Sequence, residues 1–238
     1  MAKHGKRYIQ AKSEIVVGHE YAPLEAVQLI KRQEISKFDA TIEVHFRLGV
    51  NVRHADQQLR GTVSLPHGTG RTVRVAVFAE GEKAREAEAA GADIVGSEDL
   101  ATRIQEGFTD FDIAIAAPDM MGIVGRLGRI LGPAGKMPNP KTGTVTMDVA
   151  KAVEDVKSGK IEYRTDRTGI VHVAIGKRSF AAEQLVENYQ TVIDEIIRVK
   201  PAASKGRYIL SATMTETMGP GVPLDPTKTS NLLEEVVA

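Results

Sequence analysis

The chain has 238 residues, with 31 basic and 31 acidic side chains and a formal net charge of zero at pH 7. This length allows one or two domains, each able to bury a proper core. The absence of cysteine excludes disulfides, thiolate catalysis and Cys-ligated zinc, and no apolar run approaches the roughly 18 residues that a membrane helix needs.

The first 67 residues alternate between helical and strand patterns. Apolar residues recur at helical spacing over residues 23–33, which predicts a helix with Pro23 in its first turn. Residues 40–48 alternate between apolar and polar side chains, as in a strand with one buried face. Residues 61–65 predict a second strand, which ends at a Gly-rich turn.

From residue 73 onward, strands of the fully buried type alternate with helices. The predicted strands are residues 73–79, 93–95 and 111–117. The predicted helices are residues 82–90, 98–106, 120–131 and 148–157, and Ser97 is expected to cap the second of them. This order is typical of a parallel sheet with covering helices. It predicts a Rossmann-like α/β unit.

After residue 158 the first pattern returns. Residues 161–165 and 170–175 flank the turn at residues 166–169 and predict an antiparallel hairpin. A long helix over residues 182–199 and a strand over residues 208–215 follow.

The simplest architecture places the parallel-sheet unit as an insertion in an α+β domain built from both chain ends. We therefore expect an α/β and α+β fold of two domains. The split α+β domain comprises residues 1–67 and 160–238, and the inserted Rossmann-like domain comprises residues 68–159. The connections near residues 67–70 and 158–160 would act as a double hinge.

Charge is unevenly distributed along the chain. Residues 1–67 have 10 basic and 7 acidic side chains, a net charge of +3, whereas residues 68–159 have 11 and 14, a net charge of −3. A protein can bind RNA through a local basic face while its remainder is neutral or acidic. Composition therefore leaves nucleic-acid binding open.

The Rossmann-like unit suggests a nucleotide-dependent enzyme, but its motifs do not support one. The first strand of the unit ends in Phe78-Ala79-Glu80-Gly81-Glu82, which lacks the G-x-G-x-x-G pattern and carries carboxylates where a pyrophosphate would bind. Gly135-Lys136 is followed by Met137, so the P-loop pattern fails. The six histidines show no metal-ligand spacing. We expect no cofactor, no metal and no enzymatic activity.

Residues 125–144, GRLGRILGPAGKMPNPKTGT, form the most informative segment. It carries four cations and no acidic residue, on a stiff Gly- and Pro-rich loop. The cations are Arg126, Arg129, Lys136 and Lys141. They suit a polyanion, although a solvated surface turn is the simpler interpretation of such a loop.

The split domain also carries candidate RNA contacts. Phe38, between Lys37 and Asp39, could pack on its own helix or stack on a nucleotide. Residues 213–221, TMTETMGPG, could be a plain strand end or a turn that contacts ribose and phosphate groups. Arg53, Arg164 and Arg167 could contact phosphates, although an isolated arginine is usually a solvated surface charge.

Several segments resemble, in the same order, the large-subunit ribosomal protein L-one family. They are SKFDATIEVHFRLGV, RGTVSLPHGTGR, the segment at residues 125–144, YRTDRTGIVHVAIGK and TETMGPG. The family's signature usually reads LGRILGPRGLMPNPKxGTV, so Ala134 replaces an arginine and Lys136 a leucine. With weaker matches between them, these segments cover nearly the whole chain.

The resemblance implies a bacterial-type protein of the mobile stalk of the large ribosomal subunit, near the exit site. It implies direct binding to large-subunit (23S) rRNA, help in releasing exit-site tRNA, repression of the protein's own operon mRNA and a cytoplasmic location. The rRNA-binding residues implied by matching motifs are Lys37, Phe38, Thr41, Asp166, Thr168, Thr213, Thr217, Met218 and Gly219. Arg53, Arg164 and Arg167 are further candidates, and Arg126, Arg129, Lys136 and Lys141 would contact tRNA. A nucleotide-dependent enzyme and a regulator acting off the ribosome are the alternatives.

Overall fold

The computed structural model describes residues 4–228, and the chain divides into two compact units. Unit 1 is formed by the chain up to Gly70 together with the chain from Tyr163 onward, and unit 2 is Arg71–Glu162. The predicted fold class, with both α/β and α+β parts, is confirmed: unit 2 contains a parallel sheet and unit 1 an antiparallel one. The assignment of RNA binding to the split domain stays a prediction.

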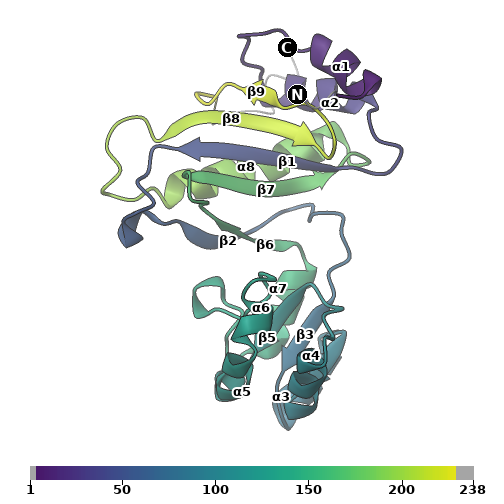
Figure 1. Cartoon of the computed structure of the whole chain (residues 1–238), viewed down its shortest axis with the longest axis vertical. Helices are drawn as coiled ribbons and strands as arrows, with labels where there is room; N and C mark the ends of the chain where they lie inside the picture. The colour runs from purple at the N-terminus through teal and green to yellow at the C-terminus, as the bar shows by residue number, and fades with distance from the viewer. Residues whose placement is uncertain (1–3, 229–238) are drawn as a thin grey trace. The chain divides into compact units, whose positions relative to one another are not determined.

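Unit 1 is built around a four-stranded sheet in the order β7-β1-β8-β9 (Figure 1). Its strands are β1 (Thr41–Leu48), β7 (Ile170–Lys177), β8 (Ile209–Glu216) and β9 (Val222–Leu224). Its helices are α1 (Lys6–Ser13), α2 (Pro23–Gln33) and α8 (Ala182–Arg198), with a 3-10 turn, η1 (Ala55–Gln57). A separate two-stranded sheet pairs β2 (Arg60–Ser64) with β6 (Lys160–Arg164).

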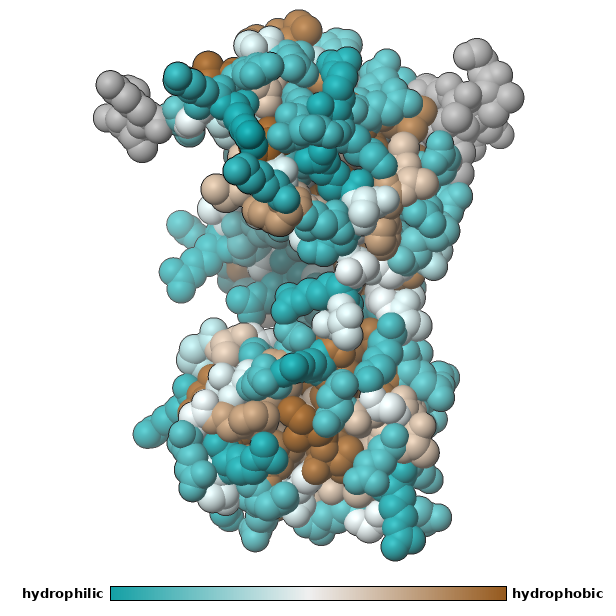
Figure 2. All heavy atoms as spheres, turned by 90° about the vertical axis from the view of Figure 1, so that its right-hand side faces the viewer, coloured by the Kyte–Doolittle hydropathy of each residue, from teal (hydrophilic) through white to brown (hydrophobic). Residues whose placement is uncertain are grey.

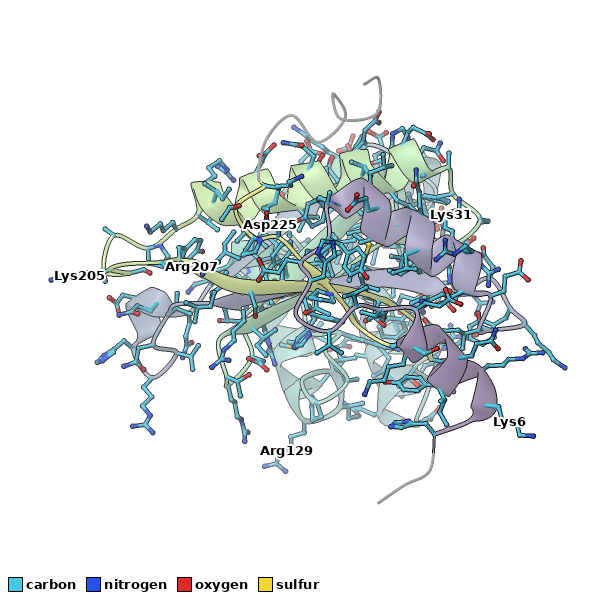
Figure 3. All side chains as sticks on the ribbon, turned by 90° about the horizontal axis from the view of Figure 1, so that it is seen from above. Lys6, Lys31, Arg129, Lys205, Arg207 and Asp225 are labelled. Carbon is cyan, nitrogen blue, oxygen red and sulfur yellow. The ribbon has the colours of Figure 1, made fainter. Side chains whose placement is uncertain are left out.

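The alternation of β1 divides the four-stranded sheet into an apolar and a polar face. Ile42, Val44 and Phe46 are fully buried, and the Phe46 ring stacks on Tyr189 of α8 with centroids 5.9 Å apart. Figure 3 shows α2 and α8 on the same side of the sheet, where they cover this apolar face. The other face carries the polar side chains of β1, and α2 and α8 do not cover it.

The predicted hairpin of residues 161–165 and 170–175 is wrong in its pairing. β6 pairs with β2 and β7 pairs with β1, so among the described residues only an isolated bridge, Thr165–Val171, joins the two segments. The turn between them is tight, since the Asp166 N–H donates to the Ile170 carbonyl at 2.9 Å. An alternating pattern identifies a strand but not its partner, and here another partner was available.

Unit 2 has a three-stranded parallel sheet in the order β4-β3-β5. The strands are β3 (Val75–Phe78), β4 (Ile94–Gly96) and β5 (Ile113–Ala116), and β3 is buried along its whole length. The helices are α3 (Glu82–Ala89), α4 (Glu98–Gln105), α5 (Met121–Arg126), α6 (Gly128–Leu131) and α7 (Val149–Lys157), with 3-10 turns η2 (Pro118–Met120) and η3 (Pro140–Thr142).

Two local predictions in unit 2 need correction. Ser97 occupies the N-cap position of α4, but its side chain makes no capping hydrogen bond; its own N–H instead donates to Asp99 Oδ1 at 2.8 Å. The single helix predicted over residues 120–131 is divided into η2, α5 and α6. Gly122, Gly125 and Gly128 fall in this stretch, and each weakens a helix by roughly 1 kcal/mol relative to alanine.

The chain segment that leaves β2 is fastened to unit 1 as far as Gly68. Asn188 of α8 is fully buried; its amide oxygen accepts from the His67 N–H at 3.1 Å, and its amide nitrogen donates to the Gly68 carbonyl at 3.0 Å. Residues 67–68, which we expected to form a hinge, therefore belong to the packed body of unit 1.

Candidate nucleic-acid interface

The pairing of β1 gathers the predicted rRNA residues into two groups at opposite ends of one sheet. β1 is antiparallel to both β7 and β8, so its start lies beside their ends and its end beside their starts. We call the two groups the aromatic end and the arginine end. The aromatic end contains Lys37, Phe38, Thr41, Thr217, Met218 and Gly219. The arginine end contains Arg53, Arg164, Asp166, Arg167 and Thr168.

At the aromatic end, Thr41 and Thr217 bind each other through backbone and side chain. The Thr217 N–H donates to the Thr41 carbonyl at 2.9 Å. The Thr217 hydroxyl accepts from the Thr41 N–H and donates to the Thr41 carbonyl, each at 3.2 Å. The Thr41 hydroxyl in turn accepts from Lys177 Nζ at 2.9 Å. The hydroxyl proton of Thr217, which we expected to serve RNA, is thus used to join two protein segments.

The turn that follows Thr217 has a strained backbone over a buried carboxyl group. Met218 has a φ of 73°, a conformation uncommon outside glycine. A Cβ on Gly219 would lie 2.8 Å from Cγ of Glu216, so only glycine fits there. Glu216 is 2% exposed. Burial raises the pKa of Glu216, and the nearby Arg178 partly opposes that rise.

Two large apolar side chains protrude at this end of the sheet. Phe38 is 57% exposed and Met218 is 72% exposed. Most of the surface that Figure 2 shows is hydrophilic, with smaller apolar areas between. Lys37 is also exposed. An aromatic ring, a thioether and an ammonium group on adjacent loops offer stacking and a phosphate contact together.

At the arginine end the side chains surround a pocket of about 430 Å³. It is lined by Val52, Arg53, Gln58, Leu59, Arg60, Arg164, Thr165, Asp166 and Arg167. Three of the predicted phosphate contacts, Arg53, Arg164 and Arg167, therefore share one concave site although they come from two distant parts of the sequence. Arg60 was not predicted, and it belongs to the same wall.

Asp166 fixes the turn on which the arginine end depends. Its Oδ1 accepts from the N–H groups of Thr168 and Ile170, each at 2.8 Å, and the Thr168 hydroxyl donates to the same carboxylate. Burial alone would raise the pKa of Asp166, but these hydrogen bonds outweigh it and lower the pKa to about 2. A loop-fixing role therefore fits this carboxylate better than contact with phosphate.

The remaining predicted contact, Thr213, lies between the two ends. It pairs with His45 of β1 on the polar face of the sheet. The Nδ1 atoms of His45 and His172 are 2.8 Å apart across β1 and β7, so one ring donates to the other. Burial, followed by the nearby His172, lowers the pKa of His45. The polar face thus joins the aromatic and arginine ends, with hydroxyl and imidazole groups between.

Some nearby basic residues were missed by sequence reasoning. Lys205 and Arg207 lie in the loop before β8, at the arginine end of the sheet (Figure 3). The loop is fastened there because Ser204 Oγ donates to the Gly49 carbonyl at 3.0 Å. Two cations just before a predicted strand were a usable signal, but nothing in the sequence placed them beside residues 49–53.

In unit 2 the loop of residues 132–143 is held by its own hydrogen bonds. Asn139 Oδ1 accepts from the Lys141 N–H at 2.8 Å, and the Asn139 N–H donates to Thr144 Oγ1 at 2.8 Å. Arg126, Arg129 and Lys141 are exposed, and Figure 3 shows the Arg129 side chain extending away from the ribbon.

Lys136 differs from Arg126, Arg129 and Lys141. Its Nζ donates to the Thr109 carbonyl at 2.9 Å and to the Phe111 carbonyl at 2.5 Å, and it lies 5.1 Å from the centroid of the Phe111 ring. Lys136, one of the four cations expected to contact tRNA, therefore already has fixed partners in the protein. This side chain ties the loop to the segment before β5.

The carboxyl edge of the parallel sheet, where a nucleotide would bind, carries mostly acidic groups. A pocket of about 300 Å³ there is lined by Glu80, Glu82, Lys83, Ala117, Asp119 and Met120, and Lys83 is paired with Asp119 at 2.9 Å. Three carboxylates around one neutralised lysine repel phosphate. Within residues 4–228, no group of three or more histidine and acidic side chains is arranged to hold a metal ion, and no helix there could cross a membrane.

Comparison with known proteins gives one consistent family. A family model described as the Ribosomal protein L1p/L10e family matches residues 29–220. The curated relatives include the large ribosomal subunit protein uL1 of Thermobifida fusca, 61% identical over 95% of this chain and 97% of the relative. The uL1 protein of Frankia alni is 60% identical over 99% of this chain and 99% of the relative. The uL1 protein of Beutenbergia cavernae is 59% identical over the full length of both.

The hydrogen bonds around Asp166 give a testable pKa. We expect its carboxyl group to titrate near pH 2 in a carbon-detected NMR titration of the folded chain. Because the pKa is lower in the folded chain, the ionised carboxylate stabilises the fold. This stabilisation is present above the pKa of about 3.9 in the unfolded chain and is lost as the pH falls toward 2. Thr168→Val removes one donor and should raise the pKa. Titration of wild-type Asp166 near pH 4 would contradict the assigned hydrogen bonds.

Proposed function

The chain belongs to the ribosomal protein L1p/L10e family, and we propose that it binds large-subunit rRNA directly through the polar face of its four-stranded sheet. As a member of this family it is a constituent of the large ribosomal subunit and works on the cytoplasmic ribosome. The finer roles are part of the proposal: a mobile stalk near the exit site, assistance in tRNA release, and repression of the protein's own operon mRNA.

The observation that carries rRNA binding is the convergence of the predicted contacts on one sheet. The segments around residues 37–41, 53, 164–168 and 213–219 are distant in sequence. The pairing of β1 with β7 and β8 brings residues 41 and 213–216 to one sheet, with residue 168 in the turn before β7, and the pocket at the end of β1 brings residue 53 together with residues 164–167. β1 has eight residues, so its two ends are separated by about 24 Å. An RNA fold with unpaired nucleotides could contact both ends at once.

The chemistry of the two ends suits RNA better than a protein partner. Arg53, Arg164 and Arg167 can bind phosphates with two parallel N–H groups, and Phe38 and Met218 offer apolar surface for bases. Between them, the hydroxyl of Thr213 and the imidazoles of His45 and His172 can exchange hydrogen bonds with ribose 2′-OH groups. A leader mRNA that repeats the same arrangement of unpaired nucleotides would use the same surface.

The proposed tRNA surface is the segment of residues 125–144 in unit 2. Arg126 and Arg129 are exposed on α5 and α6, and Lys141 is exposed on a turn held by Asn139, so these cations can attract a passing RNA without ordering a long segment. Weak electrostatic contacts suit a ligand that must leave. The proposed surface centres on these three cations and not on Lys136, whose ammonium group already donates to two backbone carbonyls.

The role of the aromatic end can be tested with the full chain and transcripts tiling the large-subunit rRNA of Thermobifida fusca. Phe38→Ala should weaken binding to the preferred transcript by roughly 5- to 150-fold, because base stacking on an aromatic ring contributes about 1–3 kcal/mol. Affinity for a scrambled RNA should change little. Filter binding or fluorescence anisotropy across a salt series gives both values.

Ile197→Ala is the matched control, because Ile197 is an exposed apolar residue of α8, which covers the opposite face of the sheet. It should leave both affinities unchanged. Equal losses for Phe38→Ala and Ile197→Ala, or a wild-type chain that prefers no transcript, would refute the proposed interface.

The tRNA proposal is tested by comparing cations of the segment at residues 125–144. The double variant Arg129→Gln with Lys141→Gln should leave the melting temperature and rRNA affinity unchanged but alter the rate at which deacylated tRNA leaves reconstituted ribosomes. Lys136→Met should lower the melting temperature of unit 2, because it removes the two hydrogen bonds that tie the loop to the backbone at Thr109 and Phe111.

Single-molecule fluorescence measures tRNA departure, and calorimetry measures melting. Unchanged tRNA departure in the double variant would mean that the exposed cations do not contact tRNA. The loop would then serve only as a brace for its own unit.

A further inference from the structure

We propose that the pocket at the arginine end takes up a single unpaired nucleotide of the bound RNA. Its base would lie against Val52 and Leu59, and its phosphates would pair with Arg53, Arg164 and Arg167. This inference rests on the proposed rRNA binding and makes it more specific. It turns a group of phosphate contacts into a site that holds one base.

The size of the pocket favours one nucleotide. Its volume of about 430 Å³ falls in the range of about 300–1,000 Å³ that small-molecule sites occupy. A flat phosphate-binding surface would need no such hollow. A base pair stacked within a helix could not enter it, so the occupant must be unpaired or flipped out of its stack.

The lining combines the two chemistries that a nucleotide requires. Arg53, Arg164 and Arg167 are exposed, and their guanidinium planes can bind a phosphate in fork geometry or stack on a base. Val52 and Leu59 supply apolar surface among them. Leu59 is only 8% exposed, so it forms part of a fixed wall and not a mobile tip.

The wall from residue 51 to residue 58 is held in shape before any ligand arrives. The Asn51 N–H donates to Gln57 Oε1 at 2.8 Å, and Gln58 Nε2 donates to the Val52 carbonyl at 2.9 Å. The Arg53 N–H donates to Asn51 Oδ1 at 3.2 Å. Each bond limits the conformational entropy that binding would otherwise cost.

The opposite wall is held in a similar way. The Thr165 N–H donates to the Leu59 carbonyl at 3.0 Å and joins the two walls through the backbone, and Asp166 fixes the turn that presents Arg167. The carboxylate of Asp166 lines the pocket but is already surrounded by N–H and hydroxyl donors, which reduces its repulsion of a phosphate. Gln58 retains an amide oxygen that can accept from the edge of a base.

Abasic scanning of the preferred transcript tests the pocket directly. Each nucleotide of the shortest Thermobifida fusca rRNA transcript that the full chain binds is replaced, one at a time, by an abasic residue. We expect one position at which base removal weakens binding by roughly 5- to 150-fold. It should differ from the positions at which base removal has no further effect once Phe38 is replaced by alanine. In the protein, Val52→Trp fills the pocket without changing its charge and should weaken the intact RNA similarly.

The losses of affinity caused by Val52→Trp and by base removal should not add if both changes remove the same contact. Val52→Trp should weaken the abasic RNA by no more than about twofold beyond the loss already present. Val17→Trp is the control for a new indole, because Val17 is 98% exposed in the loop after α1. For Arg167→Gln, which should weaken binding to the intact RNA, the control is Arg85→Gln on α3, an equal charge change in unit 2.

A second readout needs no protein variant. 2-Aminopurine placed at the abasic-sensitive position, or beside it if that position is a pyrimidine, should change its fluorescence when the full chain binds and the base leaves its stack. The pocket would be overturned, while rRNA binding stands, by either of two results. One is normal affinity for every abasic RNA except those altered at nucleotides that contact the aromatic end. The other is a loss from Val52→Trp that adds in full to the loss from base removal. A chain that binds no transcript would overturn both proposals.

Discussion

The antiparallel pairing of β1 with both of its neighbours is the constraint on which the candidate interface depends. Because β7 and β8 run opposite to β1, the loop that enters β1 meets the turn that leaves β8, and the end of β1 meets the turn that enters β7. The alternation of β1 then assigns one face to the core and the other to solvent. A register shift of one residue would exchange these faces and bury the polar groups.

Hydrogen bonds within the protein prepare both ends of this sheet for a ligand. Thr217 joins the two loops of the aromatic end, and Asp166 shapes the turn of the arginine end. Neither side chain has to reach the RNA to matter for binding. Their neighbours Phe38, Met218 and Arg167 are the exposed groups, and they are held near their places at little further cost in conformational entropy.

Much of the fold follows from residue patterns, because burial on one or two faces leaves a periodic signal. The alternation over β1, the apolar run of β3 and the helical spacing of α2 and α8 each predict the element that the structure contains. Pairing leaves no such signal, which is why the hairpin of residues 161–165 and 170–175 was assigned wrongly. The glycines of residues 122–128 weakened a helix whose apolar spacing looked continuous.

The candidate site was only partly accessible from the sequence. Motifs identified Phe38, Asp166 and Thr217, but not that the Thr217 hydroxyl bonds to the backbone of Thr41. Lys136 looked like a free cation because the carbonyls of Thr109 and Phe111, some 25 residues away, leave no trace in a pattern. Lys205 and Arg207 reach the arginine end through the tertiary contact of Ser204 with Gly49.

The central claim is that one RNA contacts both ends of the sheet at the same time. The chain lacks cysteine, so a single iron–EDTA probe can be attached at Ser36→Cys beside the aromatic end, at Ala203→Cys beside the arginine end, or at Gln190→Cys in the middle of α8 as a control. We expect the first two probes to cleave the same bound rRNA transcript at two separate groups of nucleotides, and the control to leave it intact. Cleavage from only one end, or from α8, would contradict a single RNA lying along the polar face.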